Sequence, residues 1–214
     1  TFADFRYNQR GLLESVPGVI DDYDYNPSGQ KQRLSLACGI STTYEYDQRL
    51  RLKRLRSIRE RDNLVLQDMS YTFDKVSNIT SIKDNRTREQ LNLIGSELNL
   101  DNTEAAKFNV SQSFKYDSLY RLTKAANENV FGTIEYRYDS IGNMIRKDAD
   151  LIDFDPLMNL GDITCGGSTG TSGRIGRDSG FQPGPHAITG TQKGPGGPMV
   201  FRYDDNGNLI SKQG

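Results

Sequence analysis

The sequence predicts an all-β protein built from repeated β-hairpins that join into one spiralling sheet. Three observations carry this prediction: an aromatic motif recurs along the chain, apolar and polar residues alternate as they do in strands, and the composition is polar. Only 35% of the 214 residues are hydrophobic, and the mean hydropathy is −0.68. A hairpin of about 20 residues cannot bury an apolar face alone, so consecutive hairpins must stack. The polar composition favours a shell over a solid sandwich.

The motif is nine residues long, with an aromatic–x–Tyr–Asp–x–x–Gly–Asn pattern that ends in Leu or Met at 136–144 and 201–209. Looser copies lie at 5–13, 23–31, 44–52, 71–79 and 114–122, with a marginal copy at 152–160. Most copies recur with a period of about 20 residues. Successive second aromatics are 43 residues apart before residue 116 and 49 apart before residue 203. Each gap fits either a decayed repeat or an insertion, and we favour an insertion for the second gap.

Each motif is interpreted as a strand, a turn and a returning strand. The two aromatics at i and i+2 point to one face, and the Asp carboxylate accepts a hydrogen bond from an amide two residues on. Glycine then adopts positive φ without a Cβ clash. The motif residues are Phe5, Tyr7, Tyr23, Tyr25, Tyr44, Tyr46, Asp47, Tyr71, Phe73, Asp74, Phe114, Tyr116, Asp117, Tyr136, Tyr138, Asp139, Gly142, Asn143, Phe201, Tyr203, Asp204, Gly207 and Asn208. Leu50, Ser77 and Tyr120 replace the glycine in three copies, where we expect turns of a different shape.

Segments outside the motif give further predictions. We predict strands at 50–58 and 64–68 joined by a turn at 61–63. Alternating leucines predict a further hairpin with arms at 91–93 and 98–100 around Gly95 and Ser96. A short helix is possible at 103–108, where Thr103 could cap it. Residues 165–198 are rich in Gly, Ser, Thr and Pro, which indicates a flexible loop or insertion within the repeat array.

Charged and polar clusters are candidate functional sites. A net charge of −1 gives no global attraction to nucleic acid. The run from Arg49 to Arg61 (Arg49, Arg51, Lys53, Arg54, Arg56, Arg59 and Arg61) could hold an acidic cargo or a polyanion, but a solvated strand face is the favoured interpretation. Asp148, Asp150, Asp153 and Asp155 lack the spacing of a calcium loop, and Asp21, Asp22 and Asp24 are likewise interpreted as solvated. We therefore expect no metal and no cofactor.

Catalytic motifs are also missing from the sequence. The glycines at 166, 167, 170, 173 and 176 lack the GK[ST] ending of a phosphate-binding loop. His186 has no nucleophile that can be paired with it from sequence. The tyrosines could stack sugars, although ladders between neighbouring hairpins account for them more simply. We expect no catalytic residues and a chain that is not an enzyme.

Cys38 and Cys165 lie too far apart for a metal knuckle or a redox pair and are interpreted as ordinary thiols. No apolar run has the roughly 18 residues that would span a bilayer, so no membrane span is expected. The chain opens and closes on copies of one motif, which favours a segment of something longer.

These residues resemble the RHS/YD-repeat family. The Tyr-Asp pairs at Tyr46, Tyr116, Tyr138 and Tyr203 carry the resemblance. The runs at 66–74, 78–82 and 116–122 are similar to runs in the B and C components of Tc insecticidal toxins, and 185–189 is similar to a run of bacterial RHS proteins. The resemblance implies that residues 1–214 form part of a hollow shell.

The resemblance also implies a function and partners. In toxin members the shell encloses a toxic polypeptide, so the expected role is a non-catalytic structural segment of an encapsulating shell in a secreted bacterial toxin. The implied partners are the toxin cargo polypeptide and neighbouring RHS repeats of the parent protein. The alternative is a bacterial cell-surface adhesion or carbohydrate-binding module, for which a glycan is a possible ligand. The host and the cargo are not readable from the sequence.

Overall fold

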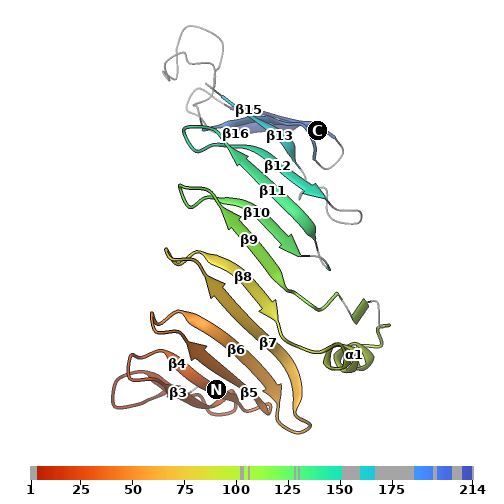
Figure 1. Ribbon diagram of the computed structural model, residues 1–214. Coiled ribbons are helices and arrows are strands. Elements are labelled where there is room, and N and C mark those ends of the chain that lie inside the picture. Colours follow the sequence, from red (N-terminus) through yellow and green to blue (C-terminus); the bar gives the residue numbers. More distant parts are fainter. Residues whose placement is uncertain are drawn as a thin grey trace. The chain divides into compact units, whose positions relative to one another are not determined.

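A computed structural model describes residues 4–101, 104–105, 107–127, 129, 131–150, 160–166, 186–194, 197–203 and 209–213. The chain divides into two compact units, Thr1–Gln112 and Ser113–Gly214. In each unit the strands of the main sheet are antiparallel and lie side by side in chain order (Figure 1). The all-β prediction is confirmed, with one short helix as the exception.

The first unit contains one small sheet, one large sheet and the helix. Its elements are β1 Arg6–Tyr7, β2 Leu13–Ser15, β3 Ile20–Tyr25, β4 Lys31–Leu36, β5 Ile40–Tyr46, β6 Leu52–Arg59, β7 Leu64–Phe73, β8 Ile79–Asp84 and α1 Arg88–Glu97. Strands β1 and β2 pair with each other, and β3 to β8 form an antiparallel meander. The predicted strands at 50–58 and 64–68 thus correspond to β6 and the first half of β7.

The second unit continues the same pattern of consecutive hairpins. Its elements are β9 Gln112–Tyr116, β10 Leu122–Asn127, β11 Gly132–Tyr138, β12 Met144–Asp150, β13 Gly161–Cys165, β14 Ile188–Thr191, β15 Met199–Tyr203 and β16 Leu209–Gln213. Each strand pairs antiparallel with the next one in the chain.

Every described motif copy joins two strands of one hairpin. The ninth residue of the copy is the first residue of the returning strand, as at Leu52 of β6 and Met144 of β12. The pairing register shifts at the second aromatic, for example between Glu45 and Tyr46. Such a β-bulge bends the strand and increases its twist. The hairpins therefore repeat the same local distortion.

The turns share one backbone conformation, so the expectation of different shapes at Leu50, Ser77 and Tyr120 is wrong. These three residues adopt φ values of 61°, 76° and 62°, in the same region as 96° at Gly142. In the turn of Leu50, the amides of Asp47 and Leu50 bond to the carbonyls of Arg51 and Asp47, both at 2.9 Å. The pairing and side-chain bonds of each turn hold a non-glycine residue in a conformation that costs roughly 1 kcal/mol or more.

The two long gaps between motif copies have different structures. Between β8 and β9 the chain forms an insertion that contains α1 and no hairpin among the described residues. In the second gap β13 and β14 pair as a hairpin, with residues 166–187 between them. The marginal copy at 152–160 lies outside the described residues except Leu160, which precedes β13. Strand β14 falls inside the segment 165–198 assigned to loop or insertion, of which 167–185 and 195–196 lie outside the described residues.

The hairpin predicted at 91–100 is wrong, because α1 occupies Arg88–Glu97. Thr87 caps the helix in a capping box: its hydroxyl accepts from the Gln90 amide, and the Gln90 side chain accepts from the Thr87 amide. A Cβ added at Gly95 would lie 2.6 Å from the Cβ of Ala105, so glycine permits the close approach of the following segment. Of the helix predicted at 103–108, Glu104 and Ala105 are helical, and Thr103 and Ala106 lie outside the described residues.

The sheet has an apolar face and a charged face. In the β5–β6 register Tyr44 lies opposite Leu55, whereas Glu45 lies opposite Arg54 on the other face. Few apolar side chains are buried. In the described residues they are Val16, Leu64, Val65, Met69, Leu91, Ala105, Ala125, Ile134, Ala149, Ile163, Cys165 and Met199. Stability therefore depends heavily on contacts between neighbouring hairpins.

Candidate functional site: the clasps between neighbouring hairpins

The carboxylate or amide at motif position four organises each turn. Asp47 Oδ1 accepts hydrogen bonds from the amides of Arg49 and Arg51 at 2.8 and 3.0 Å. The amide of Arg51 is the main cause that lowers the pKa of Asp47. Asn26 accepts from the Gln30 amide in the same way, at 2.9 Å. The predicted bond from an amide two residues on is therefore present, together with a second bond from the amide at position eight.

A tyrosine clasp joins several of the hairpins to the hairpin that comes before them. We use this name for the bond in which the hydroxyl at motif position three donates to the carbonyl at the start of the preceding hairpin's second strand. The donors and acceptors are Tyr25 and Leu13 (2.7 Å), Tyr46 and Lys31 (2.8 Å), Tyr138 and Leu122 (2.9 Å), and Tyr203 and Ile188 (2.7 Å). Burial raises the pKa of Tyr25, Tyr46 and Tyr138, so these hydroxyls keep the proton that they donate.

Several hairpins are also joined to the next hairpin by a contact that we call a forward clasp. In a forward clasp, a side chain at motif position six or eight donates a hydrogen bond to the turn of the following hairpin. The contacts are Arg10 with the carbonyls of Asn26 and Pro27 (3.1 and 3.0 Å), Gln30 with Leu50 (2.7 Å), Arg49 with Lys75 (2.8 Å), Arg51 with Asp74 (3.3 Å) and Arg121 with Asp139 (3.3 Å). Most of these donors are charged, and hydrogen bonds to charged groups are roughly twice as strong as neutral ones.

The two kinds of clasp reinforce each other. Arg121 lies 4.7 Å from the centroid of the Tyr138 ring whose hydroxyl forms a tyrosine clasp. Arg51 lies 4.4 Å from the Phe73 ring, which has no hydroxyl. Stacking a guanidinium on a ring contributes about 0.5–1 kcal/mol at an exposed site. At three joints neighbouring hairpins are thus tied by a polar bond in each direction, and at two joints a guanidinium also stacks on a ring.

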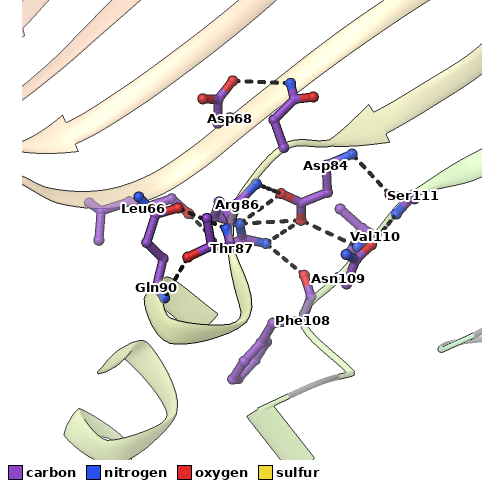
Figure 2. Close-up of polar contacts among 11 residues, drawn as sticks. Leu66, Asp68, Asp84, Arg86, Thr87, Gln90, Phe108, Asn109, Val110 and Ser111 are labelled. Carbon is purple, nitrogen blue, oxygen red and sulfur yellow. Dashed lines mark hydrogen bonds and ion pairs between the residues drawn. The ribbon is translucent and has the colours of Figure 1, made fainter. Parts of the chain in front are cut away.

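The insertion between β8 and β9 has a buried anchor of its own, shown in Figure 2. Arg86 forms an ion pair of 2.6 Å with Asp84, and the two side chains are 9% and 0% exposed. Arg86 also donates to the carbonyls of Leu66 in β7 and Phe108 at the end of the insertion, at 2.8 and 2.6 Å. The Asp84 amide donates to the Ser111 hydroxyl at 3.0 Å. Both ends of the insertion are therefore fixed at one point.

The basic run from Arg49 to Arg61 is largely neutralised. Arg54 binds Asp68 through two nitrogens, at 2.8 and 2.7 Å, and Arg56 lies 3.5 Å from the same carboxylate. Arg59 is bound by Asp62 and by Glu97 of α1. The hydrogen bond from Arg59 is the main cause that lowers the pKa of Asp62 to about 2. Most of the basic side chains in this run are therefore paired with carboxylates of the protein itself. This pairing supports the favoured interpretation, a charged strand face, over a site for an acidic ligand.

The remaining predicted acidic clusters form no metal centre among the described residues. Asp148 pairs with Arg146 at 2.6 Å and Lys193 at 3.1 Å, whereas Asp153 and Asp155 lie outside the described part. These carboxylates belong to no group in that part that could hold a metal ion. Gly166 bonds to the Ala187 carbonyl at 2.8 Å, and the other glycines of the loop are not described.

A hollow of about 500 Å³ lies over β10, β11 and β12. It is lined by Lys124, Thr133, Glu135, Asp148, Ala149, Asp150 and Lys193. Its lysines face carboxylates, with Lys124 3.9 Å from Glu135 and Lys193 3.1 Å from Asp148. The lining contains no cysteine, serine or histidine, so it offers no nucleophile with an imidazole base.

The structure shows where the histidine and the two cysteines considered in the sequence lie. His186 Nδ1 lies 2.6 Å from Asn143 Oδ1, at the turn between β11 and β12. Cys38 and Cys165 are free thiols, the first exposed and the second buried.

Among the motif residues, Asp204, Gly207 and Asn208 lie outside the described residues. No helix of the described part is long and apolar enough to cross a membrane.

The forward clasp was missed from the sequence. Its signal is the four-residue spacing between an Asp and an Arg, present at Asp47–Arg51 and again at Asp117–Arg121, where Nε of the arginine lies 2.7 Å from Oδ2 of the aspartate. The buried anchor was missed as well, because Asp84 and Arg86 are only two residues apart in a segment with no motif.

The fold and the clasps define an array of consecutive antiparallel β-hairpins joined through the tyrosine and aspartate of a repeated turn motif. No family model matches the sequence. The toxin subunit YenC2 of Yersinia entomophaga is 30% identical in an alignment of 169 positions that covers 64% of this chain and 16% of the subunit. The chain therefore corresponds to a small part of that relative's length.

Solved Tc toxin structures share the fold. The crystal structure of TcdB2-TccC3 without its hypervariable C-terminal region matches 98% of this chain with a TM-score of 0.58 and 20% identity. The Tc holotoxin pore of Photorhabdus luminescens matches 97% with a TM-score of 0.54 and 19% identity. The matches span 12% of those chains. The chain is thus similar in sequence to a toxin subunit over part of its length, and similar in fold to Tc toxin structures over nearly all of it, in agreement with the resemblance noted from the sequence.

Proposed function

We propose that this chain is a non-catalytic structural segment of an RHS-type shell that encloses a toxin polypeptide in a secreted bacterial toxin. The observation that carries the proposal is the series of clasped hairpins. Because several joints use the same tyrosine and turn contacts, hairpins can be added one after another without a solid core. A wall that surrounds a large volume needs this kind of extendable sheet.

The relatives supply the toxin context. One is named a toxin subunit, and the solved structures of similar fold are Tc toxin assemblies, one of them described as lacking a hypervariable C-terminal region. By this comparison the partners of the chain are the neighbouring repeats of its parent protein and a cargo polypeptide. The clasps themselves have a structural role that requires no cofactor.

A protease-protection experiment tests the proposal. The longer protein that contains this chain would be treated with a broad-specificity protease, and the fate of its cargo polypeptide would be followed by mass spectrometry. The control is the same polypeptide expressed alone. We expect the polypeptide to survive within the longer protein and to be digested when free.

Equal digestion in both samples would overturn the encapsulation proposal. In that case binding to an array of immobilised glycans would separate the adhesion alternative from a purely structural role. Tyr7 is 60% exposed, so its substitution by Ala tests whether a motif tyrosine contributes to such binding.

A further inference from the structure

The last position of the motif, position nine, carries a charge in the copy at 23–31, which ends in Lys31. The other copies have an apolar residue there: Leu13, Leu52, Ile79, Leu122, Met144, Leu160 and Leu209. Lys31 is the first residue of β4, and its register partner in β3 is Tyr25. This hairpin therefore places an ammonium group beside its motif aromatics, where the other copies have an aliphatic side chain.

The ammonium of Lys31 lies among tyrosines. Its Nζ is 3.3 Å from the hydroxyl oxygen of Tyr23 and 4.9 Å from the centroid of the same ring. The hydrogen bond to Tyr23 is the main cause that raises the pKa of Lys31, and the phenols of Tyr44 and Tyr25 act in the same direction. Lys31 is therefore charged at neutral pH.

The polar groups beside this ammonium have hydrogens to donate. Of the three hydrogens of Lys31 Nζ, one is donated to Tyr23, and no carboxylate of the described part forms an ion pair with Lys31. The Tyr23 hydroxyl accepts that bond, so its own hydrogen is left for another acceptor. Burial raises the pKa of Tyr44, so its hydroxyl keeps its proton, which it donates to no described group. Tyr25 and Tyr46 differ, because their hydroxyls form the tyrosine clasps.

We call Lys31, Tyr23 and Tyr44 together the Lys31 site. Lys31 is exposed, and the two tyrosines are half-buried. The rings of Tyr23 and Tyr25 are 5.8 Å apart, and Leu34 lies opposite Tyr23 in the strand register. An exposed group of donors is thus bordered by aromatic rings and an aliphatic side chain.

We propose that the Lys31 site binds the carboxylate of an aspartate or glutamate in an extended polypeptide segment whose neighbouring side chains are apolar. A carboxylate only accepts hydrogen bonds, so it matches a group of donors, and its charge complements an ammonium without an ion pair. The apolar neighbours of the acidic residue would lie on the tyrosine rings.

A saccharide fits this site less well than a polypeptide carboxylate. Sugar hydroxyls donate as well as accept, and the three groups of the Lys31 site include no carboxylate or side-chain amide to accept from them. The ligand class follows from the site alone and does not depend on what the array encloses.

NMR titration of the ¹⁵N-labelled 214-residue chain with two capped tripeptides tests the proposal. Leu-Glu-Leu carries the carboxylate, and Leu-Gln-Leu is its neutral counterpart. The amide shifts of residues 23, 31 and 44 would be followed. We expect the glutamate peptide to bind roughly tenfold more tightly, the value of one charge-assisted hydrogen bond. The difference should shrink in about 0.5 M NaCl, because an exposed ion pair is screened by salt.

Three variants assign the binding to the proposed groups. Lys31→Met removes the ammonium and introduces the residue that Met144 supplies at the same motif position, so the variant should fold and lose the preference for glutamate. Tyr44→Phe removes one donor and should weaken binding of the glutamate peptide about threefold. Tyr136→Phe is the matched control, because it occupies the position of Tyr44 in a hairpin that has no lysine at position nine. It should leave the affinity unchanged.

Equal affinity for the two peptides, or an unchanged preference in Lys31→Met, would overturn the proposal. Tighter binding of glucuronate than of the glutamate peptide would also overturn it and would assign the site to an acidic saccharide. If Lys31→Met did not fold by circular dichroism, equal effects of Tyr44→Phe and Tyr136→Phe would still contradict the site. The protease-protection experiment tests encapsulation separately from all of these outcomes.

Discussion

At the scale of single residues, the hydroxyl at motif position three is the simplest part of the joint to test. Tyr138→Phe removes the bond to the Leu122 carbonyl and leaves the ring in place. We expect the free energy of unfolding to fall by about 1 kcal/mol, because a half-buried carbonyl loses its donor. Urea unfolding monitored by circular dichroism measures the change.

Tyr136→Phe is the matched control for this substitution. Tyr136 lies two residues earlier on the same strand, and its hydroxyl has no hydrogen-bond partner among the described residues. Its loss should leave the unfolding free energy within about 0.5 kcal/mol of wild type. Equal effects of the two substitutions would contradict the tyrosine clasp.

The turn residue at position seven gives a second prediction at this scale. Leu50 adopts φ 61° and is 52% exposed, so Leu50→Gly relieves backbone strain while removing little buried area. We expect a stabilisation of about 1 kcal/mol. Gly142→Val should have the opposite effect. A Cβ at Gly142 would meet no atom within 4 Å, but the backbone φ of 96° is unfavourable for valine, so the substitution should destabilise the chain. Thermal melts should show a raised melting temperature for Leu50→Gly and a lowered one for Gly142→Val.

The turn aspartates make part of the stability dependent on pH. Hydrogen bonds lower the pKa of Asp47 below its value near 4 in the unfolded chain, and the bond from the Arg51 amide contributes most. The stabilisation is therefore complete above about pH 4 and is lost as the pH falls through the lowered folded value. The NMR chemical shift of the Arg51 amide should therefore follow the protonation of Asp47 as the pH falls below about 4, whereas the shift of the equivalent Gln30 amide, bonded to the neutral Asn26, should lack this transition.

At the scale of elements, the insertion depends on its buried ion pair. Asp84→Ala leaves the Arg86 guanidinium buried without its carboxylate, and breaking such a pair costs about 3 kcal/mol or more. We expect the amides of α1 to lose their protection against hydrogen exchange first. Asp62→Ala removes an exposed ion pair with Arg59 and should have little effect on stability.

The sequence predicts hairpins well where the motif recurs and fails where it does not. Strand β6 begins at the ninth residue of its copy because the Asp turn and its αL residue fix the register. The leucines at 91, 93, 98 and 100 also fit a strand pattern, so α1 was mistaken for a hairpin. The capping box formed by Thr87 and Gln90 is the sequence signal that identifies this segment as a helix.

The candidate site was only partly predictable from the sequence. The role of the turn aspartates follows from local chemistry, since their hydrogen bonds span two to four residues. The forward clasps join residues 16 to 26 apart, for example Arg10 with Asn26 and Arg49 with Lys75. Their partners depend on how hairpins lie side by side, which local pattern does not specify.

At the scale of the whole molecule, each unit is a series of antiparallel hairpins with little fully buried apolar area. A chain held mainly by joints between neighbours should unfold in steps rather than in one transition, because the contacts of the described strands are mainly with the strands beside them. Hydrogen exchange across a urea series should show groups of hairpins that lose protection at different concentrations. If all strands lost their protection at the same urea concentration, the protein would unfold cooperatively, which would contradict stepwise unfolding of the hairpins.

Electron cryomicroscopy of the longer protein, with its cargo polypeptide present, tests the shell proposal most directly. The account predicts that the hairpins of this chain lie in the wall of a closed cavity, with their tyrosine clasps intact and additional density inside. Hairpins packed on a solid core, or exposed on the surface with no enclosed density, would contradict it.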